Sequence, residues 1–245
     1  MKTAIIINGH IRTWEKCKNN FLEAFGDLNA DIFVSVYDQQ FGYAKYIQDI
    51  QDFHEDNILS EDQIHSMFEG FNVKSFLIDN HESMMQQIEN EKKDIKLVFN
   101  TEKHGEGIFN SVYPQYRKLY NIKNIVANYE NENNFKYDRI IKTRTELIYN
   151  TELLKRCIKI LGNDEFLIDD GNVTPNDVIF VTNRDNAFAV IDFMYNEFFN
   201  PVYPDESVSW PPHSILGQAL SHNNINVMNR KFIVHVEREK LQQVY

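Results

Sequence analysis

A strand, a helix and a second strand follow one another at the start of the chain, and this order limits the fold more than any other feature. Residues 4–8 read AIIIN, a β-branched run typical of a buried central strand. Residues 13–25 carry apolar side chains at helical spacing, and residues 30–38 form a second buried run. This order predicts a right-handed βαβ unit whose ligand crevice lies beyond the strands' carboxyl ends, where Asn8 and Asp38 would lie.

The rest of the chain alternates between helical and extended patterns, without an internal repeat or a flexible linker. Helices are predicted over residues 60–68, 81–93, 107–133, 151–161, 183–199 and within 211–227, and strands over 72–80, 137–149, 165–170, 177–183 and 231–239. We therefore expect a three-layer α/β fold, with a mostly parallel central sheet that becomes mixed in the C-terminal half. Residues 1–245 would form a single domain.

Composition narrows the class of protein. The 245 residues are 42% hydrophobic, and no apolar run is long enough to span a bilayer. Cys17 and Cys157 are far apart and predict reduced thiols, which together with the absence of a signal-peptide pattern favour a cytoplasmic location. The net charge of -11 argues against a broad electrostatic surface for nucleic acid. An acidic protein that binds a diphosphate would need a few well-placed cations or a divalent metal ion.

The turn after the first strand is the first candidate site. Gly9 would let the backbone approach a diphosphate closely, and Arg12 would supply bidentate donors near the start of a helix. Alternatively, Arg12 is a solvent-exposed arginine that pairs with Glu15 or Asp38. The stretch lacks a complete glycine fingerprint, so both interpretations stay open.

The strand predicted over residues 137–149 carries the second candidate. If it is continuous, Lys142, Arg144 and Glu146 share one face near its carboxyl end. Three ionisable groups on one face are costly unless they meet a ligand, a metal ion or one another. An ion-pair ladder on a half-exposed strand fits the pattern equally well.

Two later segments carry further candidates. Asp169 and Asp170 precede Gly171, and paired carboxylates on such a turn can hold a divalent ion, although Asp-Asp-Gly is also simply a good turn. Trp210 and two prolines precede His213, which could act as a general base at a helix start or only cap the helix. No signature of a serine hydrolase, zincin, zinc ribbon or P-loop NTPase occurs.

Several segments together resemble one family. Residues 5–17 resemble its opening strand and turn, residues 28–38 its second strand, and residues 110–149 a long helix followed by a strand that ends Arg-x-Arg-Pro-Asp-Leu. Residues 175–187 and 211–227 resemble its later segments. The family is that of the GT-A-like glycosyltransferases of phages, giant viruses and bacterial polysaccharide loci. Each motif is weak alone, and their collinear order over most of the chain carries the resemblance.

The resemblance implies a hexosyl- or pentosyltransferase that moves a sugar from a nucleotide-sugar donor to an acceptor hydroxyl. Residues up to about 145 would bind the nucleotide sugar, and the rest would bind the acceptor, which is a glycan, another hydroxyl compound or modified DNA. From the resemblance and the motifs together, the expected donor-binding residues are Asn8, Gly9, His10, Arg12, Asp38 and Arg144; the catalytic residues are His213, Glu146 and Asp170; the metal ligands are Glu146 and Asp170; and the acceptor-binding residues are Trp210 and His213.

Departures from the family's pattern leave other functions open. His10 replaces a glutamine, Thr145-Glu146 replaces proline-aspartate, and His213 replaces a glutamate. Glu146 keeps the charge but reaches one methylene farther, so use of Mn²⁺ or Mg²⁺ is one option beside neutralisation by arginine and lysine. The lost carboxylates would also suit a catalytically silent nucleotide-sugar-binding module. A transferase acting on hydroxylated bases of phage DNA is a third interpretation, which the net charge weakens.

Overall fold

The protein folds into three layers around a twisted mixed sheet. The computed structural model describes residues 1–11, 13–38, 58–96, 107–171, 174–201 and 211–236. In this part of the chain, seven strands lie in the order β3-β2-β1-β4-β7-β6-β8. Their bounds are β1 Thr3–Gly9, β2 Asp31–Tyr37, β3 Val73–Asp79, β4 Arg139–Thr143, β6 Glu165–Gly171, β7 Thr174–Asn183 and β8 Asn226–Arg230.

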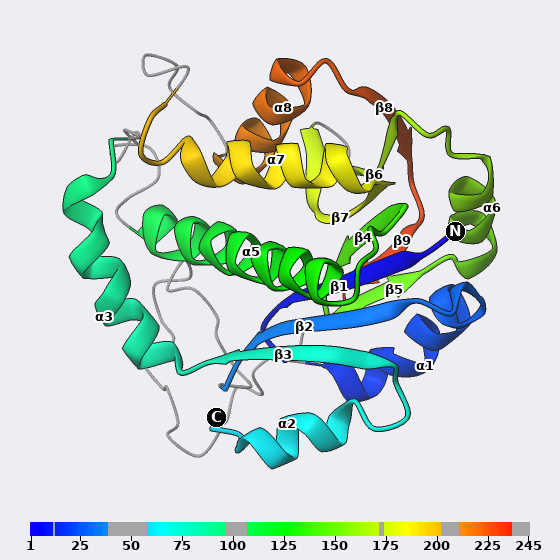
Figure 1. Cartoon of the computed structure of the whole chain (residues 1–245), viewed down its shortest axis with the longest axis horizontal. Helices are drawn as coiled ribbons and strands as arrows, with labels where there is room; N and C mark the ends of the chain where they lie inside the picture. Colours follow the sequence, from blue (N-terminus) through cyan, green and yellow to red (C-terminus); the bar gives the residue numbers. More distant parts are fainter. Residues whose placement is uncertain (12, 39–57, 97–106, 172–173, 202–210, 237–245) are drawn as a thin grey trace, which may run out of the picture.

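The expected change from a parallel to a mixed sheet is confirmed. The four strands β3, β2, β1 and β4 run parallel to one another. Strand β7 pairs antiparallel with both β4 and β6, whereas β6 and β8 are parallel. The carboxyl ends of the four parallel strands lie together at the left of the sheet in Figure 1. We call this boundary, formed by Gly9, Tyr37, Asp79 and Thr143, the carboxyl edge.

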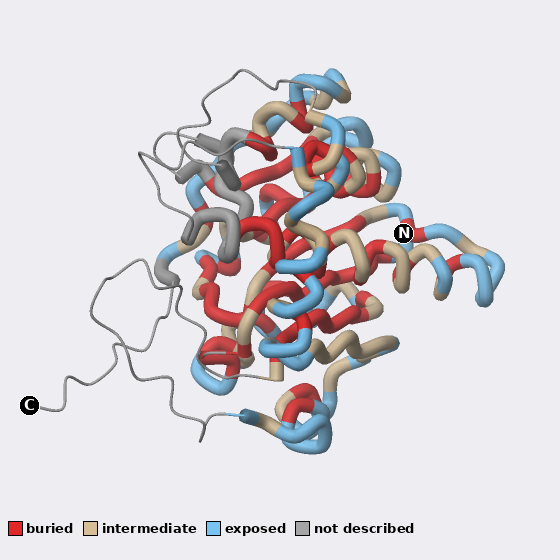
Figure 2. Tube along the Cα trace, turned by 90° about the vertical axis from the view of Figure 1, so that its left-hand side faces the viewer, coloured by how far each residue is buried: buried red, intermediate tan, exposed pale blue. Residues whose placement is uncertain are grey.

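Helices cover both faces of the sheet. Side chains alternate along β1, so that Ala4 and Ile6 enter one core while Ile5 and Ile7 enter the other. Helices α3, α5, α7 and α8 cover the first face, and α1, α2 and α6 cover the second (Figure 1). Their bounds are α1 Trp14–Phe25, α2 Glu61–Met67, α3 His81–Glu91, α5 Gly107–Glu132, α6 Thr151–Ile160, α7 Arg184–Asn196 and α8 Pro211–His222. Figure 2 shows the buried residues concentrated along the strands between these layers.

The segment 137–149 does not form one strand. Strand β4 ends at Thr143, and β5 (Leu147–Tyr149) pairs antiparallel with β9 (Ile233–Val236) in a separate small sheet. A turn divides them, in which the Thr145 hydroxyl donates to the carbonyl of His10. The prediction that Lys142, Arg144 and Glu146 share one strand face is therefore wrong, because the chain leaves the main sheet between the first and the second of them.

A buried lysine ties α5 to the carboxyl edge. The Lys118 side chain is fully buried, and its ammonium donates to the carbonyl of Val36 at 2.9 Å and to the Asp79 carboxylate. The same ammonium lies 4.1 Å from the centroid of the Tyr37 ring. Burial lowers the pKa of Lys118 to about 8, although the Asp79 carboxylate opposes this shift. The lysine thus joins the ends of β2 and β3 at a cost in desolvation.

Lys118 makes stability depend on pH in an unusual direction. The unfolded chain keeps the lysine protonated up to about pH 10.4, so between about pH 8 and 10 it binds more protons than the folded protein does. The free energy of unfolding should therefore rise by about 2 kcal/mol over this window. Lys118→Met should abolish the rise, as measured by urea unfolding at several pH values. Burial raises the pKa of Tyr37, so its phenol stays neutral throughout.

A matched variant separates titration from packing. Ile122→Val removes one methylene from the same buried face of α5 and carries no titratable group, so it should lower stability while keeping the rise with pH. A parent protein whose stability is flat or falls between pH 8 and 10 would contradict the buried, ionised Lys118.

Candidate active site at the carboxyl edge

The carboxyl edge contains the point where the strand order reverses. From β1 the chain continues on one side to β2 and β3, while β4 pairs with the other side of β1. In open α/β sheets, ligands bind in the crevice at such a switch point. Two of the sequence-predicted residues, Asn8 and Gly9, end β1 at this position, and Arg144 follows the last residue of β4.

Gly9 and Arg144 lie side by side at the switch point. Gly9 has a φ of 141°, in the region that favours glycine, and a Cβ atom at this position would lie 3.8 Å from Arg144 Nε. Arg144 Nη2 lies 2.9 Å from Glu146 Oε1, and the Glu146 side chain is 1% exposed. The structure thus brings Gly9, Arg144 and Glu146 together although the three residues do not share a strand.

The arginine keeps unused hydrogen-bonding capacity. Arg144 Nε is buried and makes no hydrogen bond within the described part of the chain, whereas Glu146 Oε1 faces Arg144 Nη2 in the ion pair. The other oxygen, Glu146 Oε2, lies 3.3 Å from the Thr145 hydroxyl oxygen, whose proton is donated chiefly to the carbonyl of His10. Because buried polar atoms are normally satisfied, the free Nε donor beside Gly9 points to a group that arrives with a ligand.

His10 and Asp38 line the same edge. The His10 ring stacks on the Tyr37 ring with centroids 4.4 Å apart. Asp38 directly follows β2, and its carboxylate accepts from the side-chain amide of Asn80 at 2.7 Å. These contacts hold an aromatic pair and a carboxylate beside the Gly9 turn. Tyr37 was not among the sequence candidates, although its position at the end of β2 could have indicated it.

Asn8 points to the layer between the sheet and α5. Its side-chain amide nitrogen donates to the carbonyl of Gln115 at 3.3 Å, and its oxygen makes no hydrogen bond within the described residues. Ser35, which pairs with Asn8 across the parallel strands, also has a buried hydroxyl without a hydrogen bond there. A small cavity opens beside Asn8, and Lys142 lines it as well.

Asp169 has a structural position that sequence reasoning did not foresee. The strand predicted over residues 165–170 is confirmed as β6, which runs to Gly171, so Asp169 and Asp170 lie on a strand and not on the Asp-Asp-Gly turn that was also considered. Asp169 Oδ1 accepts from the backbone N–H groups of Phe232 and Ile233, both at 2.8 Å, and thereby fixes the start of β9. Asp170 lies on the same strand in register with Pro175, and its side chain lies outside the described part of the structure.

Three further candidates lie wholly or partly outside the described residues. Arg12 and Trp210 lie outside the described residues. His213 occupies the first turn of α8, and its side chain is not described. Their predicted roles in donor binding, acceptor binding and catalysis stay predictions.

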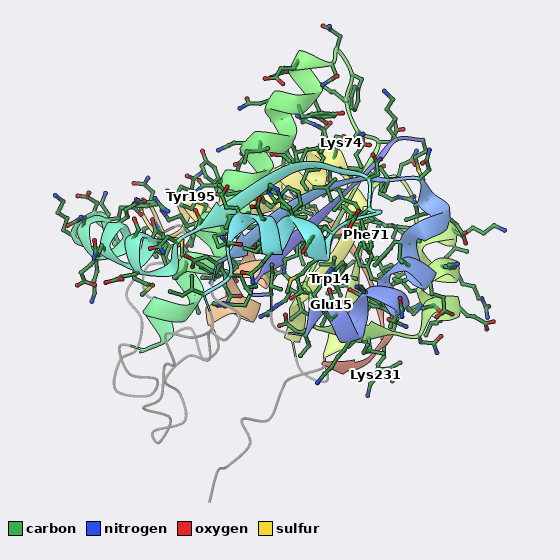
Figure 3. The ribbon with its side chains drawn as sticks, turned by 90° about the horizontal axis from the view of Figure 1, so that it is seen from below. Trp14, Glu15, Phe71, Lys74, Tyr195 and Lys231 are labelled. Atoms are coloured by element: carbon green, nitrogen blue, oxygen red, sulfur yellow. The ribbon has the colours of Figure 1, made fainter. Side chains whose placement is uncertain are left out.

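Trp14, which follows the first turn, belongs to the core. Its ring stacks on Phe68 with centroids 4.7 Å apart and lies 5.4 Å from the centroid of Phe71 (Figure 3). The indole N–H donates to the carbonyl of Met67 at 2.9 Å. A tryptophan after a glycine turn suggests a nucleoside pocket, but here its helix turns it toward α2 and away from solvent.

At the carboxyl edge, the described residues include a cationic guanidinium but no cluster of metal ligands. Among them, no three His, Cys, Asp or Glu side chains are grouped so as to hold a metal ion. The Glu146 carboxylate faces the Arg144 guanidinium, which occupies one of its oxygens. The predicted Mn²⁺ or Mg²⁺ site depends on Glu146, whose carboxylate already faces Arg144, and on Asp170, whose side chain is not described.

No protein-family model and no curated protein matches the chain. In structure, the chain is similar to the apo form of the glycosyltransferase GlyE of Streptococcus pneumoniae TIGR4, with 12% identity and a TM-score of 0.39 over 93% of this chain and 44% of that one. It is also similar to the galactosyltransferase LgtC in complex with donor and acceptor sugar analogues, with 11% identity and a TM-score of 0.41 over 94% of this chain and 73% of that one. The chain spans less than half the length of GlyE. No described helix is long and apolar enough to cross a membrane.

Proposed function

We propose that the protein is a glycosyltransferase that moves a sugar from a nucleotide-sugar donor to an acceptor hydroxyl. One observation carries the proposal: the buried Nε of Arg144, which makes no hydrogen bond among the described residues, lies beside a glycine of positive φ at the switch point of the sheet. This arrangement suits a diphosphate, because the glycine admits the phosphates to the backbone and the guanidinium can bind two of their oxygens. The motifs at these positions resemble the GT-A-like family.

In this proposal, the residues of the carboxyl edge bind different parts of the donor. Arg144 would neutralise the negative charge that develops on the nucleoside diphosphate as the glycosidic bond breaks. Glu146 would orient the guanidinium through their contact of 2.9 Å. The His10–Tyr37 stack and Asp38 would flank the nucleoside at the ends of β1 and β2.

The acceptor would bind on the C-terminal half, from about residue 146 onward. His213 would take the proton from the attacking hydroxyl, which then displaces the diphosphate from the sugar. A helix N-terminus disfavours a protonated imidazole, so the first turn of α8 suits a residue that must accept a proton near neutral pH. Trp210 would offer an apolar face to a sugar ring.

A panel of nucleotide sugars tests the proposal by thermal shift, with and without Mn²⁺. A donor at about 100 times its dissociation constant should stabilise the fold by about 2.7 kcal/mol and raise the Tm by on the order of 5 °C. Release of the nucleoside diphosphate from that donor should then be measurable. No shift with any nucleotide sugar would refute donor binding, and a shift without release would indicate a silent binding module.

Glu146→Gln tests whether the ion pair serves turnover. The change leaves Arg144 without a buried counter-charge, so we expect donor turnover to fall by about 100-fold and stability by about 1–3 kcal/mol. Turnover is measured as release of the nucleoside diphosphate, and stability by urea unfolding.

Glu130→Gln is the matched control. Glu130 is equally buried and lies 2.9 Å from Arg184, but this pair joins α5 and α7 near Arg139, at the opposite end of β4 from the carboxyl edge. It should lose similar stability while keeping turnover. If Glu146→Gln instead keeps the parent's turnover, the Arg144–Glu146 pair is only structural.

A further inference from the structure

A small cavity lies directly beneath the switch point, on the side of the sheet that α5 covers. Its lining comes from three strands, β1, β4 and β7, and from helices α5, α7 and α8 above them: Asn8, Gln115, Tyr116, Leu119, Lys142, Phe180, Met194 and Leu216. The free space holds about one water molecule. The cavity therefore lies next to Gly9, yet none of the contacts described for the Arg144–Glu146 pair uses it.

The orientation of the Asn8 amide is fixed by its neighbour. The Asn8 nitrogen donates to the carbonyl of Gln115, and the opposite orientation would place two acceptor oxygens against each other. Asn8 Oδ1 must therefore be the atom without a hydrogen bond among the described residues. The side chain is only 5% exposed, so this acceptor is buried and calls for a donor.

Lys142 supplies the complementary group. Its side chain is 4% exposed, and its ammonium donates to the carbonyl of Val178 at 3.2 Å. An ammonium has three protons to donate and cannot accept. The other walls are largely apolar, with Phe180, Met194 and Leu216 among them. An amide with an unsatisfied acceptor and a lysine side chain thus both line a space that holds about one water molecule.

We propose that this cavity binds one hydroxyl group of the transferred sugar. A hydroxyl can donate to Asn8 Oδ1 and accept from the Lys142 ammonium, and it fits a space that excludes an acetamido or phosphate group. A water molecule would satisfy Asn8 Oδ1 before the sugar arrives. The inference rests on the proposed glycosyltransferase function and deepens it: Asn8 and Lys142 select donors that carry a hydroxyl at one ring position.

Binding measurements on single-deoxy donors test this selection. The probes are the nucleotide sugar that most stabilises the protein, its free nucleoside diphosphate, and derivatives of that sugar lacking one hydroxyl each. In the parent protein, one deoxy derivative should bind about tenfold more weakly than the full donor. Lys142→Met should bind the full donor about tenfold more weakly than the parent protein does. The affinities of the variant for the same deoxy derivative and for the free nucleoside diphosphate should both stay within about twofold of the parent's.

Lys155→Met is the control for loss of a positive charge, because Lys155 lies on the surface of α6 and pairs there with the exposed Asp27. It should leave all three affinities unchanged. Equal weakening of the nucleotide sugar and the free diphosphate in Lys142→Met would overturn the proposal, since the lysine would then act on the nucleotide or on the fold. A parent protein that binds every deoxy derivative as tightly as the full donor would overturn it without any variant.

A high-resolution crystal structure separates this inference from the proposed function. We expect an ordered water within hydrogen-bond distance of Asn8 Oδ1 in the free protein, replaced by a sugar oxygen in the donor complex. A water that persists beside bound donor would make the cavity a structural hydration site and overturn the proposal. If no nucleotide sugar binds at all, the proposed function fails first, and the hydroxyl site fails with it.

Discussion

The parallel pairing of β1 with β4 decides which groups meet at the candidate site. The register runs from Thr3 opposite Arg139 to Ile7 opposite Thr143, so the next residues of both strands leave the sheet at the same level. Strand β1 ends in Gly9, a glycine of positive φ, and β4 is followed by a turn held by the Thr145 hydroxyl. A shift of this register by one residue would invert every side chain of β4 and remove Lys142 from the α5 face.

The layers around β1 and β4 contain buried charged groups, which the fold tolerates by giving them local partners. Lys118, Lys142, Glu130 and Glu146 are all less than 5% exposed. A buried ion costs several kcal/mol unless it has partners, and such pairs add little net stability even when complete. In a core otherwise built from aromatic and aliphatic side chains, these groups fix the positions of α5 and of the strand ends. These buried groups therefore contribute more to the placement of α5 and the strand ends than to net stability.

The sequence predicted the sheet better than its edge. The runs 4–8 and 30–38 are apolar and β-branched, and the helix between them has a regular apolar face, so local physics alone indicates the βαβ unit. The end of β4 is different, because Arg144-Thr145-Glu146 continues an alternating pattern with no glycine or proline to mark the turn. The turn is made by Thr145 bonding to a carbonyl 135 residues earlier, and a contact of that range leaves no local signal.

The helix α5 shows a second limit of the same kind. Lys118 stands four residues before Ile122 on the buried face, so a charged residue at an apolar position was visible in the printed sequence. Its partners were not, since Val36 and Asp79 come from separate strands. The sequence signal that could have been used is a charged residue at an apolar position. A lysine within an apolar helical stripe predicts a buried ammonium, which must find a hydrogen-bond acceptor.

The separation of Lys142 from Arg144 has a consequence for recognition. On a continuous strand, the two cations would have formed one basic patch, suited to any anion. The turn after Thr143 instead leaves Lys142 under α5, beside a neutral amide, and places Arg144 next to Gly9. For a protein with a net charge of -11, attraction of the proposed diphosphate would have to come from such a local, shielded cation, because exposed charges are screened within about 8 Å at physiological ionic strength. Under the proposed function, Arg144 would act on charge and Lys142 on shape and hydrogen bonding, so that a single turn would separate the neutralisation of phosphate from the recognition of the sugar.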